Sequence, residues 1–139
     1  MKDISDQFDV YVNPPAFIVV VAWIAIWASA LVMTIYVVWF NLWTLHSYII
    51  FYVLNALNIG WIFVWLVGTK TTLLVGNCLQ IVMAAVGLAL WTSTHDNSNT
   101  LASYYFVRNV IMLYVGWTVA AVLVTFNMVL VHFFSIDKK

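Results

Sequence analysis

The apolar residues of this chain fall into four long runs that short polar stretches separate. The runs cover roughly residues 15–40, 48–67, 71–91 and 105–134. Each run supplies the ~20 apolar residues that a helix needs to cross the hydrocarbon core of a bilayer. We therefore predict an all-α fold, a polytopic membrane bundle of four transmembrane helices that forms one domain over residues 1–139.

The composition narrows the class of protein further. Hydrophobic residues make up 65% of the chain and charged residues 7%, and the formal net charge is zero. These values exclude a soluble domain and leave no basic surface for nucleic acid. No Asp or Glu lies inside any run, which argues against cation-coupled transport through a membrane carboxylate. The single cysteine, Cys78, is expected to pack as a small buried residue of the third run.

The positive charges predict an orientation in the membrane. The first loop (41–47) and the third loop (92–104) contain no Lys or Arg. The lysines lie in the two tails and the second loop: Lys2, Lys70, Lys138 and Lys139. By the positive-inside rule, both termini face the cytoplasm or its organellar equivalent.

Aromatic residues gather on the opposite side of the membrane, where they are expected to form an interfacial belt. The belt consists of Trp39, Trp43, Tyr48, Trp91, Tyr104 and Tyr105. Arg108 lies on the same side, about one turn inside the last run. We expect its long side chain to extend along the helix to the interface.

Residues that are not aliphatic line up on one face of each run at helical spacing. Small residues let membrane helices approach, and Asn or Gln side chains bind across helices, so part of this pattern is explained by packing. We interpret Asn55 in this way. Indoles are too bulky for such packing, and together they are typical of the wall of a pocket for a flat, apolar ligand. Five indoles share these faces: Trp23, Trp27, Trp61, Trp65 and Trp117.

The sequence contains no complete set of residues for catalysis or metal binding. No nucleophile and base are paired, and no phosphate-binding loop is present. Two of the three histidines, His46 and His95, lie in or beside loops on one side, and His132 lies near the other end of the last run. Haem ligation by two histidines is disfavoured because the axial ligands must face each other. We expect a protein that is not an enzyme and requires no cofactor.

Three motifs, each on a different predicted helix, resemble those of one family. "NPPAFIVVVAW" (13–23) resembles the Pro-Pro-x-aromatic…Trp opening of a helix in the TspO/MBR family, the translocator proteins and tryptophan-rich sensory proteins. "NIGWIFVW" (58–65) is similar to the family's Asn-x-x-Trp helix, and "YVGWTVAA" (114–121) to its Tyr-x-x-Trp helix. The family has five helices and the Pro-Pro motif opens the second, so we expect a bundle that lacks the first.

The resemblance implies a bundle whose cytosol-facing half encloses a ligand pocket, often in a homodimer. The ligand would be a tetrapyrrole such as protoporphyrin or haem, or a sterol, and we expect a mitochondrial membrane. Matched position by position, the resemblance implies seven pocket residues: Trp23, Trp27, Asn58, Trp61, Tyr114, Trp117 and Ala121.

The residues leave a second function open. Very little of the chain lies outside the predicted spans, and no catalytic set is complete. A bundle of this kind also suits a non-catalytic accessory subunit of a large membrane assembly, such as a mitochondrial respiratory complex. A fold can persist in such a role after its site has been lost.

Overall fold

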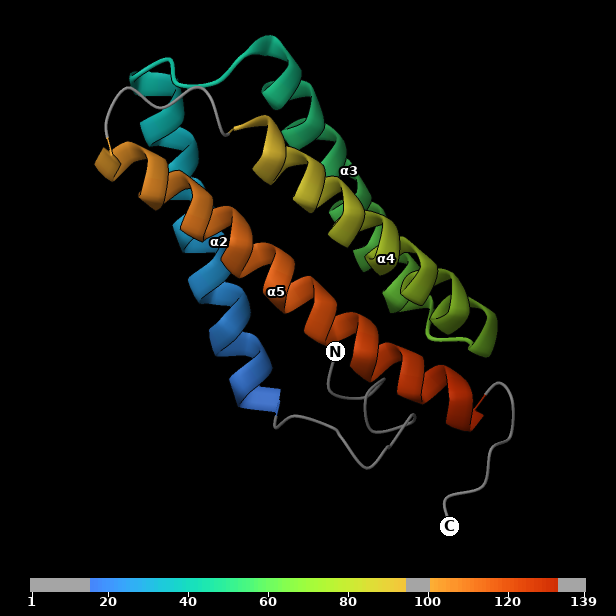
Figure 1. The fold of residues 1–139 in the computed structure, drawn as a ribbon. Coiled ribbons are helices and arrows are strands. Elements are labelled where there is room, and N and C mark those ends of the chain that lie inside the picture. Colours follow the sequence, from blue (N-terminus) through green and yellow to red (C-terminus); the bar gives the residue numbers. More distant parts are fainter. Residues whose placement is uncertain (1–15, 95–100, 133–139) are drawn as a thin grey trace.

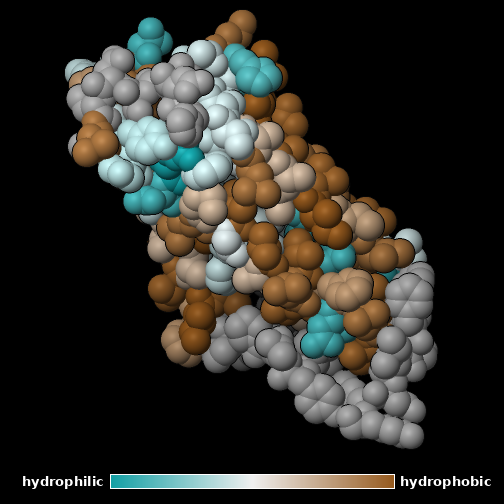
Figure 2. Space-filling model, in the orientation of Figure 1, coloured by the Kyte–Doolittle hydropathy of each residue, from teal (hydrophilic) through white to brown (hydrophobic). Residues whose placement is uncertain are grey.

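The computed structural model describes residues 16–94 and 101–132. These residues form four α-helices in sequence order: α2 (Ala16–Trp39), α3 (Leu45–Val67), α4 (Lys70–Ser93) and α5 (Leu101–His132) (Figure 1). Each helix is long and apolar enough to cross a membrane, so the predicted all-α bundle of four spans is confirmed. The chain is a multi-pass membrane protein whose outer surface meets lipid. Figure 2 shows mainly apolar side chains along the visible face, with hydrophilic residues gathered at the end where α2 joins α3.

Local hydrogen bonds explain why two helices begin earlier than the hydrophobic pattern predicted. The backbone N–H of Ser47 donates to the side chain of Thr44 at 3.3 Å, which caps the start of α3. Thr69 and Thr72 form a reciprocal capping box at the start of α4. Gly68, with φ of 64°, supplies the left-handed residue that ends α3 just before this cap. The α3–α4 connection is therefore short, and the two helices lie side by side.

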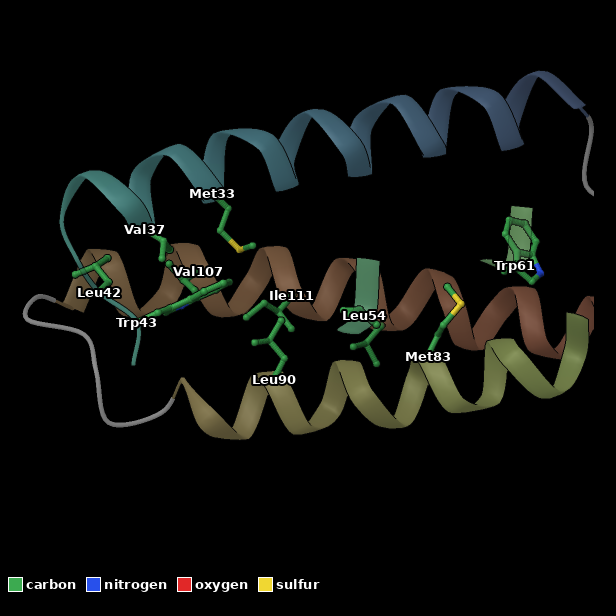
Figure 3. Close-up of a cluster of buried hydrophobic side chains, with 11 residues drawn as sticks. Met33, Val37, Leu42, Trp43, Leu54, Trp61, Met83, Leu90, Val107 and Ile111 are labelled. Carbon is green, nitrogen blue, oxygen red and sulfur yellow. The ribbon is translucent and has the colours of Figure 1, made fainter. Parts of the chain in front are cut away.

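The helices pack in the spatial order α3, α4, α5, α2. α4 lies against both α3 and α5, and α2 packs chiefly against α5. In Figure 3, Val37 of α2 lies beside Val107 of α5 near the loops, and Leu90 of α4 lies beside Ile111 of α5. Toward the other end, where Trp61 is drawn, α2 and α5 move apart (Figures 1 and 3). The bundle is therefore closed at the end where α2 ends and α3 begins, which we call the loop end. It is spread at the opposite end, where α2 begins and α3 ends.

Two expectations from the sequence are wrong. Cys78 is exposed on the outer surface of α4, because the buried face of that helix is formed by its glycines, its carboxamides and three large apolar residues. Asn55 does not link two helices through its N–H group, which donates to the carbonyl of Phe51 one turn earlier in α3 at 2.8 Å. The motif residues Pro14 and Pro15 and the charged tails lie outside the described residues.

Candidate functional site

Five tryptophans from three helices form one cluster at the spread end of the bundle. Trp23 of α2 is its centre: its ring is stacked on Trp61 of α3 at 5.8 Å and on Trp27 at 6.4 Å. The edge of Trp117 of α5 meets Trp23 at 6.0 Å, with the planes at 77°. Trp65 continues the cluster from Trp61 at 5.7 Å. The predicted convergence of the five indoles is confirmed.

A groove beside this cluster runs between α2 and α3 and opens toward the lipid. Its volume is about 680 Å³, which falls within the range of small-molecule sites. Indole rings form a large part of its wall, and no charged residue lines it. Trp27 is 42% exposed, so this ring faces the open space directly. The lining residues are Val20, Trp23, Ile24, Trp27, Ala28, Leu31, Trp61 and Ile62.

A glycine on α4 lets Trp61 lie deep in the bundle. A Cβ added at Gly76 would meet Nε1 of Trp61 at 3.7 Å, so the indole edge rests on the bare backbone there. Trp61 is 6% exposed as a result, although its ring also forms part of the groove wall. Its N–H group has no hydrogen-bond partner among the described residues. The Trp61 ring thus separates the open groove from the interior of the bundle.

Polar atoms without partners lie behind the tryptophans. Asn58, one turn before Trp61 on α3, is 1% exposed, and its Oδ1 receives no hydrogen bond within the described part of the chain. The hydroxyl of Tyr114 on α5 lies close to the side chains of Asn58 and Thr118, but outside hydrogen-bond geometry. Nε1 of Trp117 is also buried and unpartnered among these residues. Such groups are costly in a bilayer interior, where no bulk water reaches them.

The seven residues that the resemblance implied do not all reach the same place. Trp23, Trp27 and Trp61 line the groove, and Trp117 contacts it through Trp23. Two others, Asn58 and Tyr114, lie on the interior side of the groove, and we call these buried polar residues the polar layer. Ala121 is half-buried one turn beyond Trp117 and does not line the groove.

Gln80 is a site candidate that the resemblance left out. It is 3% exposed on α4, and its Oε1 has no partner among residues 16–94 and 101–132. The alignment of Gln80 with Asn77, Ala84 and Gly87 along one face of the third run was the signal in the sequence. No close set of three metal-ligating side chains occurs in the described part of the chain.

Arg108 lies at the opposite end of the bundle, where two aromatic rings enclose it. Its side chain is 7% exposed, and its guanidinium lies over the ring of Trp91 at 3.7 Å and over that of Tyr104 at 4.8 Å. The guanidinium therefore lies among rings of the predicted belt, and these two rings enclose the cation between α4 and α5. Trp43, another residue of that belt, is buried as well.

The groove, the indole stack and the polar layer behind it are therefore the features that a function must explain. Comparison with protein-family models, with curated proteins and with solved structures found no match for this chain.

Proposed function

We propose that this protein is a membrane-embedded, non-catalytic binding protein of the TspO/MBR type, and that it holds a flat hydrophobic ligand against its tryptophan cluster. The ligand class is a tetrapyrrole or a sterol. The observation that carries the proposal is the groove of about 680 Å³ whose wall includes Trp23, Trp27 and Trp61. A flat apolar molecule in that groove exchanges lipid contact for stacking on indole faces.

The position of the groove supports the same proposal. Its tryptophans belong to the first half of α2 and the last third of α3. That half of the bundle lies toward the side where the positive-inside rule places the termini. We accordingly propose that the ligand enters from the cytoplasm-equivalent half of the membrane, in a mitochondrial membrane, as the resemblance implies.

Titration of the purified full-length protein with protoporphyrin, followed by tryptophan emission, tests this function. We expect saturable quenching in the wild type. Trp23→Leu should weaken the apparent affinity by roughly fivefold to tenfold, since one aromatic stack is worth about 0.5–1.5 kcal/mol and the leucine also loses indole area. Trp39→Leu is the matched control, because Trp39 is 81% exposed at the loop end, away from the groove.

Two outcomes would count against the proposal. Quenching that rises linearly with porphyrin and never saturates would indicate partition into detergent rather than binding. Equal affinities for Trp23→Leu, Trp39→Leu and the wild type would place the ligand elsewhere on the protein.

A second candidate function is favoured by the loose attachment of α2. This helix packs closely against α5 only, and open grooves flank it on both sides. An accessory subunit would fill these grooves with helices of neighbouring chains rather than with a small molecule. Native electrophoresis after mild detergent extraction distinguishes the two, because migration only as a monomer or dimer excludes the subunit role.

A further inference from the structure

Gln80 and Asn58 lie at the same depth in the bundle. Trp61 of α3 rests on Gly76 of α4, which fixes the level of the two antiparallel helices. Asn58 lies three residues before Trp61, and Gln80 lies four residues after Gly76. Both side chains are therefore about one turn from this contact, on the loop side of it. The Tyr114 hydroxyl lies close to Asn58, so the register places Gln80 at the depth of the polar layer behind the tryptophan cluster.

The two carboxamides of this layer differ from other carboxamides in the spans. The N–H group of Asn77 donates to the carbonyl of Val122 on α5 at 3.0 Å, and that of Asn55 bonds within its own helix. Asn58 and Gln80 are 1% and 3% exposed, and each has a carbonyl oxygen without a donor among the described residues. An unmatched acceptor at this depth has neither lipid nor bulk water to satisfy it.

The missing partner must be a hydrogen-bond donor, because a carboxamide oxygen can only accept. Two protein donors lie nearby, but neither is in place: the Tyr114 hydroxyl lies close to Asn58 outside hydrogen-bond geometry, and the N–H of Trp61 rests on the bare backbone at Gly76. We propose that Gln80 belongs to the ligand site and that, with Asn58, it selects flat ligands that carry a hydrogen-bond donor on one edge. This inference rests on the proposed function, and it adds a residue and a chemical class to it.

Access to the layer runs through the tryptophan stack. Trp23 stacks on Trp61 and meets the edge of Trp117. It belongs to α2, which packs closely against α5 but not against α3 or α4. Stacking on a neighbouring indole can be exchanged for stacking on a flat ligand. The ligand then takes the place of the Trp23 ring, and the Trp61 ring, which separates the groove from the interior, must also turn before a polar edge of the ligand reaches Asn58 and Gln80.

Carbazole and dibenzofuran test the inference, since they are flat tricycles of nearly equal size. Carbazole carries an N–H donor where dibenzofuran carries an ether oxygen. Carbazole binding to the full-length protein in detergent is followed by its fluorescence anisotropy, and dibenzofuran binding by displacement of carbazole. We expect carbazole to bind roughly tenfold more tightly to the wild type, which is the effect of about one buried hydrogen bond.

Variants identify the residue that makes the distinction. Gln80→Met keeps the length of the side chain and removes the carbonyl, so the preference for carbazole should fall to about twofold or less. The affinity for dibenzofuran should stay the same in that variant, which also shows that the groove is intact. Asn109→Leu is the matched control, because Asn109 is exposed on α5.

Each other outcome overturns a defined part of the proposal. Equal, saturable binding of both probes to the wild type would overturn the inference about the donor and leave the proposed function standing. A preference that survives in Gln80→Met would remove Gln80 from the site. The absence of saturable binding for both probes would overturn the inference, and the protoporphyrin titration would then decide separately whether the proposed function stands.

Discussion

α2 and α4 are of equal length and both cross the membrane, yet they relate to the bundle in opposite ways. α2 is almost entirely aliphatic and aromatic, and its buried residues are Ile26, Met33 and Val37. α4 contains two glycines, two carboxamides and several hydroxyl residues, and it is the most buried helix of the four. In a bilayer, lipid is as apolar as the protein core, so hydrophobic side chains gain little by leaving it. Close packing of small residues and polar contacts between helices decide which helix lies at the centre.

The polar side chains of the two helices show the same difference. On α2, Ser29 and Thr34 each donate to a carbonyl one turn earlier in their own helix, at 2.7 Å. On α4, the amide of Asn77 bonds to α5, and Ser93 at its end bonds to Ser47 of α3 at 3.2 Å. Most of α2 can therefore face lipid without an unmet polar group, whereas α4 requires its neighbours.

Removing the close approach of α4 and α5 should have the largest effect on stability. A Cβ at Gly87 would lie 2.7 Å from Cγ2 of Val115, which is a buried, stiff, β-branched side chain. We expect Gly87→Ala to lower the free energy of unfolding by about 1–3 kcal/mol, the usual cost of overpacking. Circular dichroism during titration with SDS measures this change.

Two further variants show whether the loss of stability in Gly87→Ala comes from overpacking against Val115 or from replacing a helical glycine with alanine. Gly116→Ala on α5 should be neutral or stabilising by up to ~1 kcal/mol, because no atom lies within 4 Å of its added Cβ and alanine favours the helix. Adding Val115→Ala to Gly87→Ala should give a double variant that is more stable than the sum of the single changes predicts. Strict additivity would contradict a contact between the two positions.

The polar link from α4 should have an intermediate effect. Asn77→Leu removes the hydrogen bond to the carbonyl of Val122, and we expect a loss of about 1 kcal/mol, within the range measured for interhelical bonds in membranes. Asn55→Leu is the matched change on α3, where the amide bonds within its own helix. A change within about 0.5 kcal/mol is expected there, by comparison with ordinary local contacts. Equal losses in the same SDS titration would show that these amides do not differ in kind.

Helical spacing was sufficient to predict the four helices and the convergence of the tryptophans, because both follow from length and periodicity. Depth and direction were harder to predict. Cys78 was expected inside and is exposed, because hydropathy alone cannot distinguish a face toward lipid from one toward protein in a membrane helix. The sequence also did not indicate that Arg108 would be enclosed by protein, since its burial depends on rings from two helices, Trp91 and Tyr104.

The candidate site shows the same limit. The motifs led to Trp23, Asn58 and Trp61, but Gln80 belongs to a helix on which no motif was found. Its depth became clear only from the contact between Trp61 and Gly76, which sets the register of α3 and α4. Such a register depends on backbone approach at one glycine, and no periodic pattern in a single sequence specifies it.

The smallest effect is expected where α2 does make a polar link to its neighbour. The Tyr36 hydroxyl and the Ser103 hydroxyl share a hydrogen bond of 2.6 Å near the loops. Tyr36→Phe removes this bond but keeps the ring, which packs against Phe40 and Phe106 at 4.8 and 5.5 Å. We expect a loss of about 0.5 kcal/mol, near the average for interhelical bonds in membranes, in the same SDS titration. Tyr52→Phe, at a ring that is 68% exposed on α3, should change nothing. A loss as large as that of Asn77→Leu would mean that α2 depends on polar contacts as α4 does, and the contrast between the two helices would then fail.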